Sequence, residues 1–438
     1  MTQAGPAGPV QVNVPLREPF YPKAGEEVVY EPDVKIIRDD RSHHALPPAE
    51  ILELREHLRT AGRVVVVAGQ QAASPGLAAA LDEFAAARQA ALVADVISNL
   101  SDVRRTVQRQ DIFLAGLSKE QKAALKPDLL ITFGQSLISK SLKLFLRDAA
   151  PSQHWHLQAS GEAADTFRRL TRIIRVQPAT FFQQLLVLKT ADYNGSGGSN
   201  PSFSAVAEAV VPANVPSVAA AWQQADAAAA EFMERYFAGA GQPFNEFSAF
   251  RLALAALPES TALHLANSMA VRYANILGLP AGRQIEVFAN RGTSGIDGCT
   301  STAVGAALAR PERPVVLLTG DVAFFYDRNA FWHNYPTPNL RVVLFNNHGG
   351  GIFRIIDGPR QQPELDEFFE TTQALTAENL CRDFSLRYFP VSSFDELNAA
   401  LPVFFAAESG AAVLEVFTDS KTNAAFFEEY RKAVKAAF

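Results

Sequence analysis

The feature that most constrains the fold is a repeated alternation of short apolar runs with longer helical patterns. The runs include "VVVVA", "LLITF", "VVLL" and "VVLF", and each is bounded by polar residues or glycine. Short runs that are apolar throughout are typical of strands covered on both faces, and the segments between them have the patterns of helices. We therefore predict an α/β protein built on doubly wound, parallel sheets.

The alternation falls into two series, which we interpret as two domains. The first series covers 49–189 and the second covers 218–438. Between them, residues 190–217 contain "NGSGGSNPS" and several prolines, a composition typical of a flexible linker. Residues 26–48 are polar and interrupted by prolines, so we interpret them as another linker. A chain of 438 residues is too long for one ordinary core, in agreement with this division.

Residues 1–25 show a different pattern. The stretch "VQVNVPLREPFYP" alternates like a strand and then stops in proline. A strand this early in the chain has no earlier element to pair with. We therefore expect residues 1–25 to be the C-terminal remnant of a further domain.

Composition narrows the class of protein. The net charge is −6 and the pI about 5.8, so we expect no nucleic-acid partner. No apolar run reaches the roughly 18 residues of a membrane span, and the N-terminus lacks the pattern of a signal peptide. The two cysteines, Cys299 and Cys381, favour a reducing, cytoplasmic location over a disulfide framework.

Polar or glycine-rich residues follow four predicted strands of the second series. Ligands of open α/β sheets bind beyond the carboxyl ends of the strands, so these positions predict a binding site. They are 266–268, 289–298, 319–321 and 346–351.

Asp321 and Asn347 are the candidate metal ligands within this set. They lie 26 residues apart, about one helix and one strand of a βαβ unit, and sequential parallel strands tend to be neighbours. A carboxylate, an amide oxygen and a carbonyl from the glycine stretch form an oxygen set that suits Mg²⁺. The alternative is that Asp321 only caps the helix that follows it.

The spacing of these residues resembles a known cofactor motif. Gly320-Asp321-Val322 followed by Asn346-Asn347 is similar to the Gly-Asp-Gly and Asn-Asn motif of thiamine diphosphate enzymes, with Val322 in place of the third glycine. The stretches "ANRGTSGIDG", "GDVAFFYDRNAF" and "FNNHGGGIF" resemble the 2-succinyl-5-enolpyruvyl-6-hydroxy-3-cyclohexene-1-carboxylate synthase family of menaquinone biosynthesis. The resemblance runs through the whole chain. It implies a central domain at 49–189, a diphosphate-binding domain at 218–438 and the end of a pyrimidine-binding domain at 1–25.

The resemblance assigns residues to the cofactor and its metal. It implies that Asp321, Asn347 and the Gly349 carbonyl hold Mg²⁺, or Mn²⁺ in its place. Ile296 would wedge thiamine diphosphate into a bent shape. The implied cofactor-binding residues are Gly295, Ile296, Gly320, Asp321, Val322, Ala323, Ile352 and Phe353.

The resemblance also implies the substrates, 2-oxoglutarate and isochorismate. The first would be decarboxylated and its succinyl carbanion added to the second in a 1,4-addition. Carboxylate substrates need cations, and the implied substrate-binding residues are Ser268, Arg272, Arg291 and Lys140. Some relatives have arginine where this chain has Ser141. Without the family, Lys140 would be interpreted as a solvated surface lysine and Arg272 as the partner of a surface acid.

No catalytic residue can be assigned in this chain. In the family, the glutamate that activates the cofactor belongs to the pyrimidine-binding domain and reaches the site from a partner subunit of a homodimer or homotetramer. We therefore expect the chain alone to bind the cofactor weakly and not to turn over. A truncated sequence and a natural split gene both remain open as explanations.

Two alternative functions also remain open. One is another thiamine diphosphate 2-oxoacid decarboxylase or an acetolactate-type enzyme, which would share the metal motif. The other is a non-catalytic cofactor-binding fragment.

Overall fold

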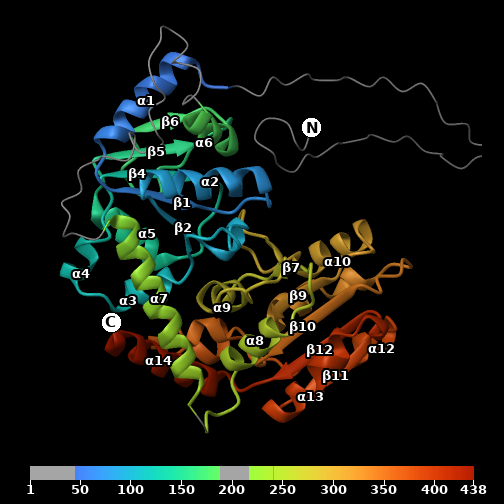
Figure 1. The fold of residues 1–438 in the computed structure, drawn as a ribbon. Coiled ribbons are helices and arrows are strands. Elements are labelled where there is room, and N and C mark those ends of the chain that lie inside the picture. The colour runs from blue at the N-terminus through green and yellow to red at the C-terminus, as the bar shows by residue number, and fades with distance from the viewer. Residues whose placement is uncertain (1–44, 188–216, 240) are drawn as a thin grey trace, which may run out of the picture.

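The computed structural model describes residues 45–187 and 217–438 with the exception of residue 240, and the statements below concern these residues. The strand expected within 1–25 and most of the two linkers lie outside them. The described residues form two α/β units, each built on its own sheet (Figure 1).

The first unit contains a six-stranded parallel sheet with the order β3-β2-β1-β4-β5-β6. Its strands are β1 (Val64–Ala68), β2 (Ala91–Ala94), β3 (Thr106–Val107), β4 (Leu129–Phe133), β5 (Gln153–Leu157) and β6 (Arg172–Ile174). Its helices are α1 (Pro48–Thr60), α2 (Pro75–Arg88), α3 (Gln110–Gly116), α4 (Lys119–Ala123), α5 (Lys140–Ala149) and α6 (Pro178–Val187), with a 3₁₀ turn at Val96–Ser98.

The second unit contains a six-stranded parallel sheet with the order β11-β12-β10-β9-β7-β8. Its strands are β7 (Ala262–Leu265), β8 (Glu286–Ala289), β9 (Val315–Gly320), β10 (Leu340–Asn346), β11 (Arg387–Val391) and β12 (Ala412–Phe417). The helices are α7 (Val218–Phe237), α8 (Glu246–Ala255), α9 (Met269–Leu277), α10 (Cys299–Ala309), α11 (Asp321–Tyr326), α12 (Glu378–Asp383), α13 (Phe394–Phe405) and α14 (Ser420–Ala437). Short 3₁₀ turns lie at Arg328–Phe331, Gly351–Arg354, Pro359–Gln361 and Ala407–Ser409, and a π-helical turn at Leu365–Phe369.

The central strands are buried on both faces, as the continuous apolar runs predict. All residues of β1, β4 and β10 are buried, and β1 pairs in parallel with β2 and β4. Such strands need helices on both sides of the sheet, and the helical segments between them supply these layers. The predicted fold class is therefore confirmed.

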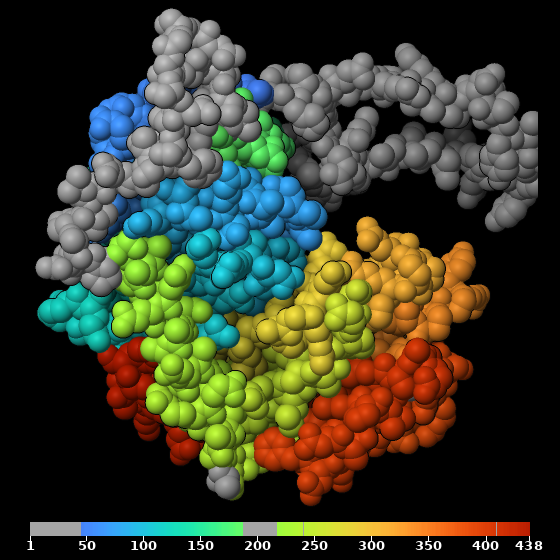
Figure 2. Space-filling model, in the orientation of Figure 1, coloured from blue at the N-terminus to red at the C-terminus, as the bar shows by residue number. Residues whose placement is uncertain are grey.

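One apolar core joins the two units. Helix α7 packs against β1, β2 and β3 of the first sheet, and the indole of Trp222 donates to the carbonyl of Leu125 at 3.0 Å. Helix α14, the C-terminal helix, contacts α3 of the first unit. The space-filling view shows α7 lying along the front of both units (Figure 2). The domain limits 49–189 and 218–438 remain a prediction. Helix α7 belongs to the second range by sequence but packs against the first sheet, and an amphipathic pattern does not show which sheet a helix covers.

The topology brings the candidate metal ligands to the carboxyl ends of two neighbouring strands of the second sheet, β9 and β10. Strand β7 lies between β8 and β9, so the chain leaves β7 toward one side and later returns on the other. The crevice at such a switch point is where open α/β sheets bind ligands. Phe345 of β10 is level with Gly320 of β9, so Asp321 and Asn347 begin at neighbouring strand ends.

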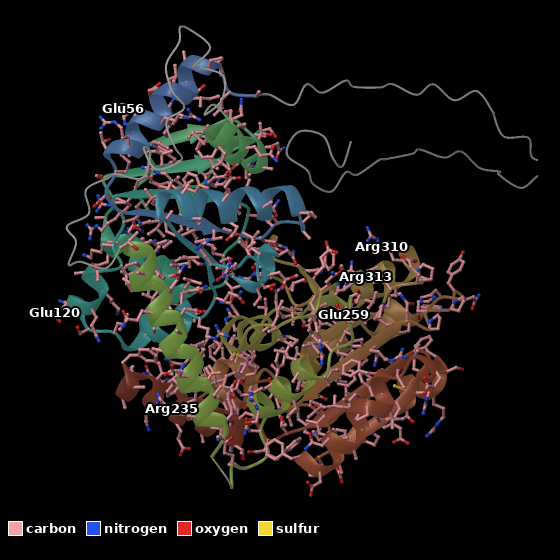
Figure 3. The ribbon with its side chains drawn as sticks, viewed as in Figure 1. Glu56, Glu120, Arg235, Glu259, Arg310 and Arg313 are labelled. Carbon is pink, nitrogen blue, oxygen red and sulfur yellow. The ribbon has the colours of Figure 1, made fainter. Side chains whose placement is uncertain are left out.

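The outer surface carries charges of both signs. Glu56 on α1 and Glu120 on α4 project from the rim of the first unit, and Arg310 from that of the second (Figure 3). In the part of the chain that the structure describes, no helix is long and apolar enough to cross a membrane.

Candidate functional site

Asp321 is a buried carboxylate at the carboxyl end of β9. Its side chain accepts hydrogen bonds from the Val322 amide (2.8 Å) and from Nε2 of Gln373 (2.9 Å), and it also interacts with the backbone amide of Gly349. Burial raises the pKa of Asp321 to about 6, and these hydrogen bonds oppose the shift. The Gly349 contact joins the end of β9 to the glycine loop after β10.

Asn347 has one satisfied and one unsatisfied side-chain atom. Its Nδ2 donates to Oε2 of Glu246 at 2.7 Å, whereas its Oδ1 is buried and has no hydrogen-bond partner among the described residues. Buried amide oxygens are normally satisfied, so this oxygen is a free acceptor for a ligand. The neighbouring Asn346 is occupied differently, because its Nδ2 donates to Leu375 and Glu415 within the core.

The glycines after Asn347 allow close approach of two backbone segments. A Cβ atom on Gly349 would lie 2.7 Å from the carbonyl oxygen of Glu370, which accepts the Gly350 amide at 2.7 Å. The Gly349 carbonyl accepts the Gly351 amide at 3.0 Å and keeps a second lone pair. Ile352 follows in a 3₁₀ turn and is partly buried.

Two buried carboxyl groups contact this loop. Glu246 is 6% exposed and Asp321 is 2% exposed, and neither has an ion-pair partner among the described residues. Burial raises the pKa of Glu246 to about 7; the hydrogen bond from Asn347 opposes the shift and the charge of Asp321 adds to it. A divalent cation would compensate this charge, and the free Asn347 oxygen is a suitable ligand for it.

Positive side chains gather on the side of the site that faces the first unit. Arg291 and Lys143 line a cavity of about 270 Å³ that runs between the loop after β8 and the carboxyl ends of β1, β4 and β5. Lys143 donates to the Leu137 carbonyl at 2.9 Å, and Arg291 donates to Oδ1 of Asn267 at 2.9 Å. Within the part of the chain that the structure describes, the buried Nε atom of Arg291 has no hydrogen-bond partner.

Lys143, Arg272 and Arg291 lie close enough for their charges to repel one another. Burial is the main cause that lowers the pKa of Lys143; Asp95 opposes the shift, and the charges of Arg291, Arg147 and Arg272 add to it. Lys143, Arg272 and Arg291 form no ion pair with a carboxylate in the described part of the chain. Lys143 and Arg291 are half-buried and Arg272 is exposed. Asp95 and Asp111 interact with these cations without pairing directly with them, so the group still favours an anionic ligand.

A buried polar cluster connects the two units behind these cations. Asn275 of α9 donates to Asp111 of α3 at 2.9 Å and to Asp95 at 3.3 Å, and accepts the Val96 amide at 3.0 Å. Asp111 also accepts the hydroxyl of Ser139, the N-cap of α5, at 2.6 Å. The helices that carry Lys143 and Arg272 are therefore connected through the half-buried carboxylate of Asp111 and the buried carboxylate of Asp95.

Sequence comparisons agree with this geometry. Residues 41–196 match the family model "Middle domain of thiamine pyrophosphate", and 276–416 match "Thiamine pyrophosphate enzyme, C-terminal TPP binding domain". A 2-succinyl-5-enolpyruvyl-6-hydroxy-3-cyclohexene-1-carboxylate synthase of Cytophaga hutchinsonii is 39% identical over 100% of this chain and 73% of its own length. The chain belongs to this synthase family. The synthases of Flavobacterium johnsoniae (31% identical, 97% of this chain, 71% of the relative) and Porphyromonas gingivalis (33%, 97% and 69%) show the same relationship.

The synthase family is thiamine diphosphate-dependent, and the metal end of the site fits that cofactor. The free Oδ1 of Asn347, the buried Asp321 and the second lone pair of Gly349 are an oxygen set for Mg²⁺. A Cβ atom on Gly320 would have no heavy atom within 4 Å, so there is open space beside this glycine. Val322 differs from the motif's glycine, and its amide is already used by Asp321.

The remaining predicted residues lie around this centre. Gly295 and Ile296 follow β8 in the loop that Asn267 holds through the carbonyls of Asn290 (2.7 Å) and Gly295 (2.6 Å). Ala323 is buried in the first turn of α11. Phe353 packs against Phe369 in the segment that follows the glycine loop, with ring centroids 5.7 Å apart.

The predicted substrate-binding residues differ in where they lie: one lines the cavity and others are exposed. Ser268 has φ of +71°, an unusual backbone conformation for a side-chain-bearing residue, and its carbonyl accepts the Arg272 guanidinium. Arg291 lines the cavity described above, whereas Lys140 is exposed in the first turn of α5. Lys143, one turn further along that helix, is the lysine that lines the cavity with Arg291.

Sequence reasoning missed four residues that support the site. These are Glu246, Gln373, Asn267 and Lys143. Asn267 lies inside the predicted strand end 266–268, so its position was a usable signal. Glu246 and Gln373 are distant in the sequence from their partners and carry no local motif.

Proposed function

We propose that this chain provides the metal-, diphosphate- and carboxylate-binding part of a synthase that decarboxylates 2-oxoglutarate and joins the succinyl unit to isochorismate. The observation that carries this proposal is that two features follow the carboxyl ends of strands in one sheet: an oxygen set at Asp321 and Asn347 after β9 and β10, and a group of cations around Arg291 after β8. The first suits Mg²⁺ and a diphosphate, and the second suits a polycarboxylate. Thiamine diphosphate supplies the electron sink for the decarboxylation.

The chain's own residues have distinct roles in this proposal. Asp321, Asn347 and Gly349 hold the cation, while Ile296 and Ile352 shape the cofactor pocket. Arg291 and Arg272 orient substrate carboxylates. The position of Lys143 beside Arg291 supports a third carboxylate contact from the first unit, in addition to the Lys140 contact that the resemblance implies.

The roles of the two lysines are separated by Lys143→Met and Lys140→Met. If Lys143 binds a substrate carboxylate, Lys143→Met raises KM for one of the two substrates by about tenfold or more, since a charge-assisted hydrogen bond contributes roughly 1.5–3 kcal/mol. The control is Lys119→Met, which changes an exposed lysine on α4. An unchanged KM in Lys143→Met would exclude this contact.

The reaction itself is tested with 2-oxoglutarate and pyruvate in parallel. The assay uses the 438-residue chain with Mg²⁺ and thiamine diphosphate, alone and together with the pyrimidine-binding domain of the Cytophaga hutchinsonii relative. We expect 2-oxoglutarate-dependent CO₂ release only in the mixture, because the family's activating glutamate lies in that domain. A preference for pyruvate would favour an acetolactate-type enzyme. Calorimetry that shows no binding of thiamine diphosphate to the mixture would exclude a cofactor role.

A further inference from the structure

Glu246 is a buried carboxylate beside the glycine loop that follows Asn347, at the first position of α8. Its Oε2 accepts Nδ2 of Asn347 at 2.7 Å, across 101 residues of sequence. Its backbone amide donates to Oδ1 of Asn423 at 2.8 Å, and Nδ2 of Asn423 approaches Oε2 at 3.4 Å. The side chain is thus held between α14 and the glycine loop.

Burial of a carboxylate costs folding free energy, and this cost indicates that Glu246 has a role other than stabilising the fold. An isolated buried carboxylate destabilises the folded state, and Glu246 has no cationic partner among the residues that the structure describes. A glutamate at the start of a helix interacts favourably with the helix dipole, but an exposed position serves that purpose equally well. Glu378, at the first position of α12, is such an exposed case.

The hydrogen bond determines which way round the Asn347 amide lies. In the structure the NH₂ group of Asn347 faces Glu246, and an ionised carboxylate, which only accepts hydrogen bonds, requires this orientation. The carbonyl oxygen Oδ1 must then face the opposite side, where it is buried and has no partner. An amide turned the other way would present NH₂, which cannot bind a cation.

We propose that Glu246 is the positioning residue that fixes the Asn347 amide with its oxygen directed toward the metal. The proposal rests on the metal–diphosphate site of the proposed function. It assigns Glu246 no direct contact with the cofactor or the substrates. Partners of this kind typically change metal affinity by 10- to 100-fold when they are removed.

Two substitutions separate orientation from charge. Glu246→Gln removes the charge but keeps an oxygen that can accept from Asn347, whereas Glu246→Met keeps the chain length and has no acceptor. Free Mn²⁺ is measured by electron paramagnetic resonance during titration of the full chain in the presence of thiamine diphosphate and the pyrimidine-binding domain. This readout does not depend on turnover.

We expect Glu246→Gln to bind Mn²⁺ within about threefold of the wild type and Glu246→Met to bind it at least tenfold more weakly. The control Glu378→Met is expected to match the wild type. Equal weakening in both Glu246 variants would show that charge, not orientation, matters and would overturn the proposal. Unchanged Mn²⁺ affinity in Glu246→Met would also overturn it and leave Glu246 a structural residue.

Thermal unfolding of each variant separates folding from metal binding. If Glu246→Met fails to fold, the comparison of Glu246→Gln with Glu246→Ser, a short side chain that cannot reach Asn347, replaces it with the same expected ratio. Absence of Mn²⁺ binding in the wild type would refute the proposed metal site itself. Failure of the proposed function is therefore distinguishable from failure of this inference.

Discussion

At the scale of single residues, the candidate site contains two buried polar atoms that have no hydrogen-bond partner among the described residues. Asn347 Oδ1 and Arg291 Nε are both buried without a hydrogen-bond partner. One is an acceptor and the other a donor, so they favour ligands of opposite charge. This division agrees with a cation bound near Asn347 and a carboxylate bound near Arg291.

Gly349 is the glycine whose replacement tests the loop most directly. In Gly349→Ala, the new Cβ would lie 2.7 Å from the Glu370 carbonyl and displace the Gly350–Glu370 hydrogen bond. We expect a loss of about 1–3 kcal/mol in the free energy of unfolding, measured by urea denaturation, together with weaker Mn²⁺ binding. The control is Gly305→Ala in α10, where the Cβ meets open space and helix propensity improves by roughly 1 kcal/mol. Equal stability of the two variants would contradict the close approach.

At the scale of elements, the position of α5 links the two units to the substrate cavity. The N-cap Ser139 accepts the Leu142 amide at 3.0 Å and donates to Asp111 at 2.6 Å. Asp111 in turn accepts from Asn275 on α9. The start of one helix therefore sets the distance between Lys143 and Arg272.

Ser139→Ala is expected to affect both stability and substrate binding. Loss of the cap and of one hydrogen bond to the half-buried carboxylate of Asp111 should lower the free energy of unfolding by about 2 kcal/mol. KM for a carboxylate substrate should rise because Lys143 loses its fixed position. The matched variant Ser217→Ala removes the exposed cap of α7, whose hydroxyl accepts the Ala220 amide at 3.2 Å, and should cost about 1 kcal/mol without a change in KM. A changed KM in both variants would argue against a specific role for α5.

At the scale of the whole molecule, neutral histidines in the core make stability depend on pH. His154 lies on β5, where its Nε2 is 2.8 Å from the hydroxyl of Thr132. Burial lowers the pKa of His154 to about 4, and the neighbouring His156 adds to the shift. His264 on β7 has a pKa lowered to about 4, mainly by burial.

The sign of the pH effect follows from proton binding. Between pH 4 and 6.5 the folded chain binds fewer protons at His154 than the unfolded chain. The contribution of neutral His154 to the free energy of unfolding is therefore complete above about pH 6.5 and is lost as the pH falls toward 4. From pH 7 to pH 5 the loss for one such histidine is about 2 kcal/mol. His154→Phe should reduce the measured decrease in unfolding free energy by this amount. Trp155→Phe on the same strand should lower stability equally at both pH values; a wild-type pH dependence in His154→Phe would contradict the prediction.

Much of the architecture could be predicted from the sequence because its cause is local. A strand buried on both faces must be apolar throughout, and β1, β4 and β10 show this directly. The position of Asp321 and Asn347 at neighbouring strand ends could also be predicted. They are separated by about one helix and one strand, and sequential parallel strands tend to be neighbours. The glycines after Asn347 could be recognised as a close approach, although Glu370 as the approaching segment could not.

The tertiary structure alone decided which side chains support these residues. Glu246 meets Asn347 from 101 residues away, and Lys143 rather than Lys140 lines the cavity with Arg291. Helix α7 also covers the first sheet although it follows the linker between the two series. Sequence periodicity determines which face of an element is buried, but the partner of that face depends on how whole elements pack. For this protein the sequence by itself determined the fold class and the pair of metal-ligand candidates, and the packing of α8, α5 and α9 decided how those candidates are oriented and where positive charge gathers.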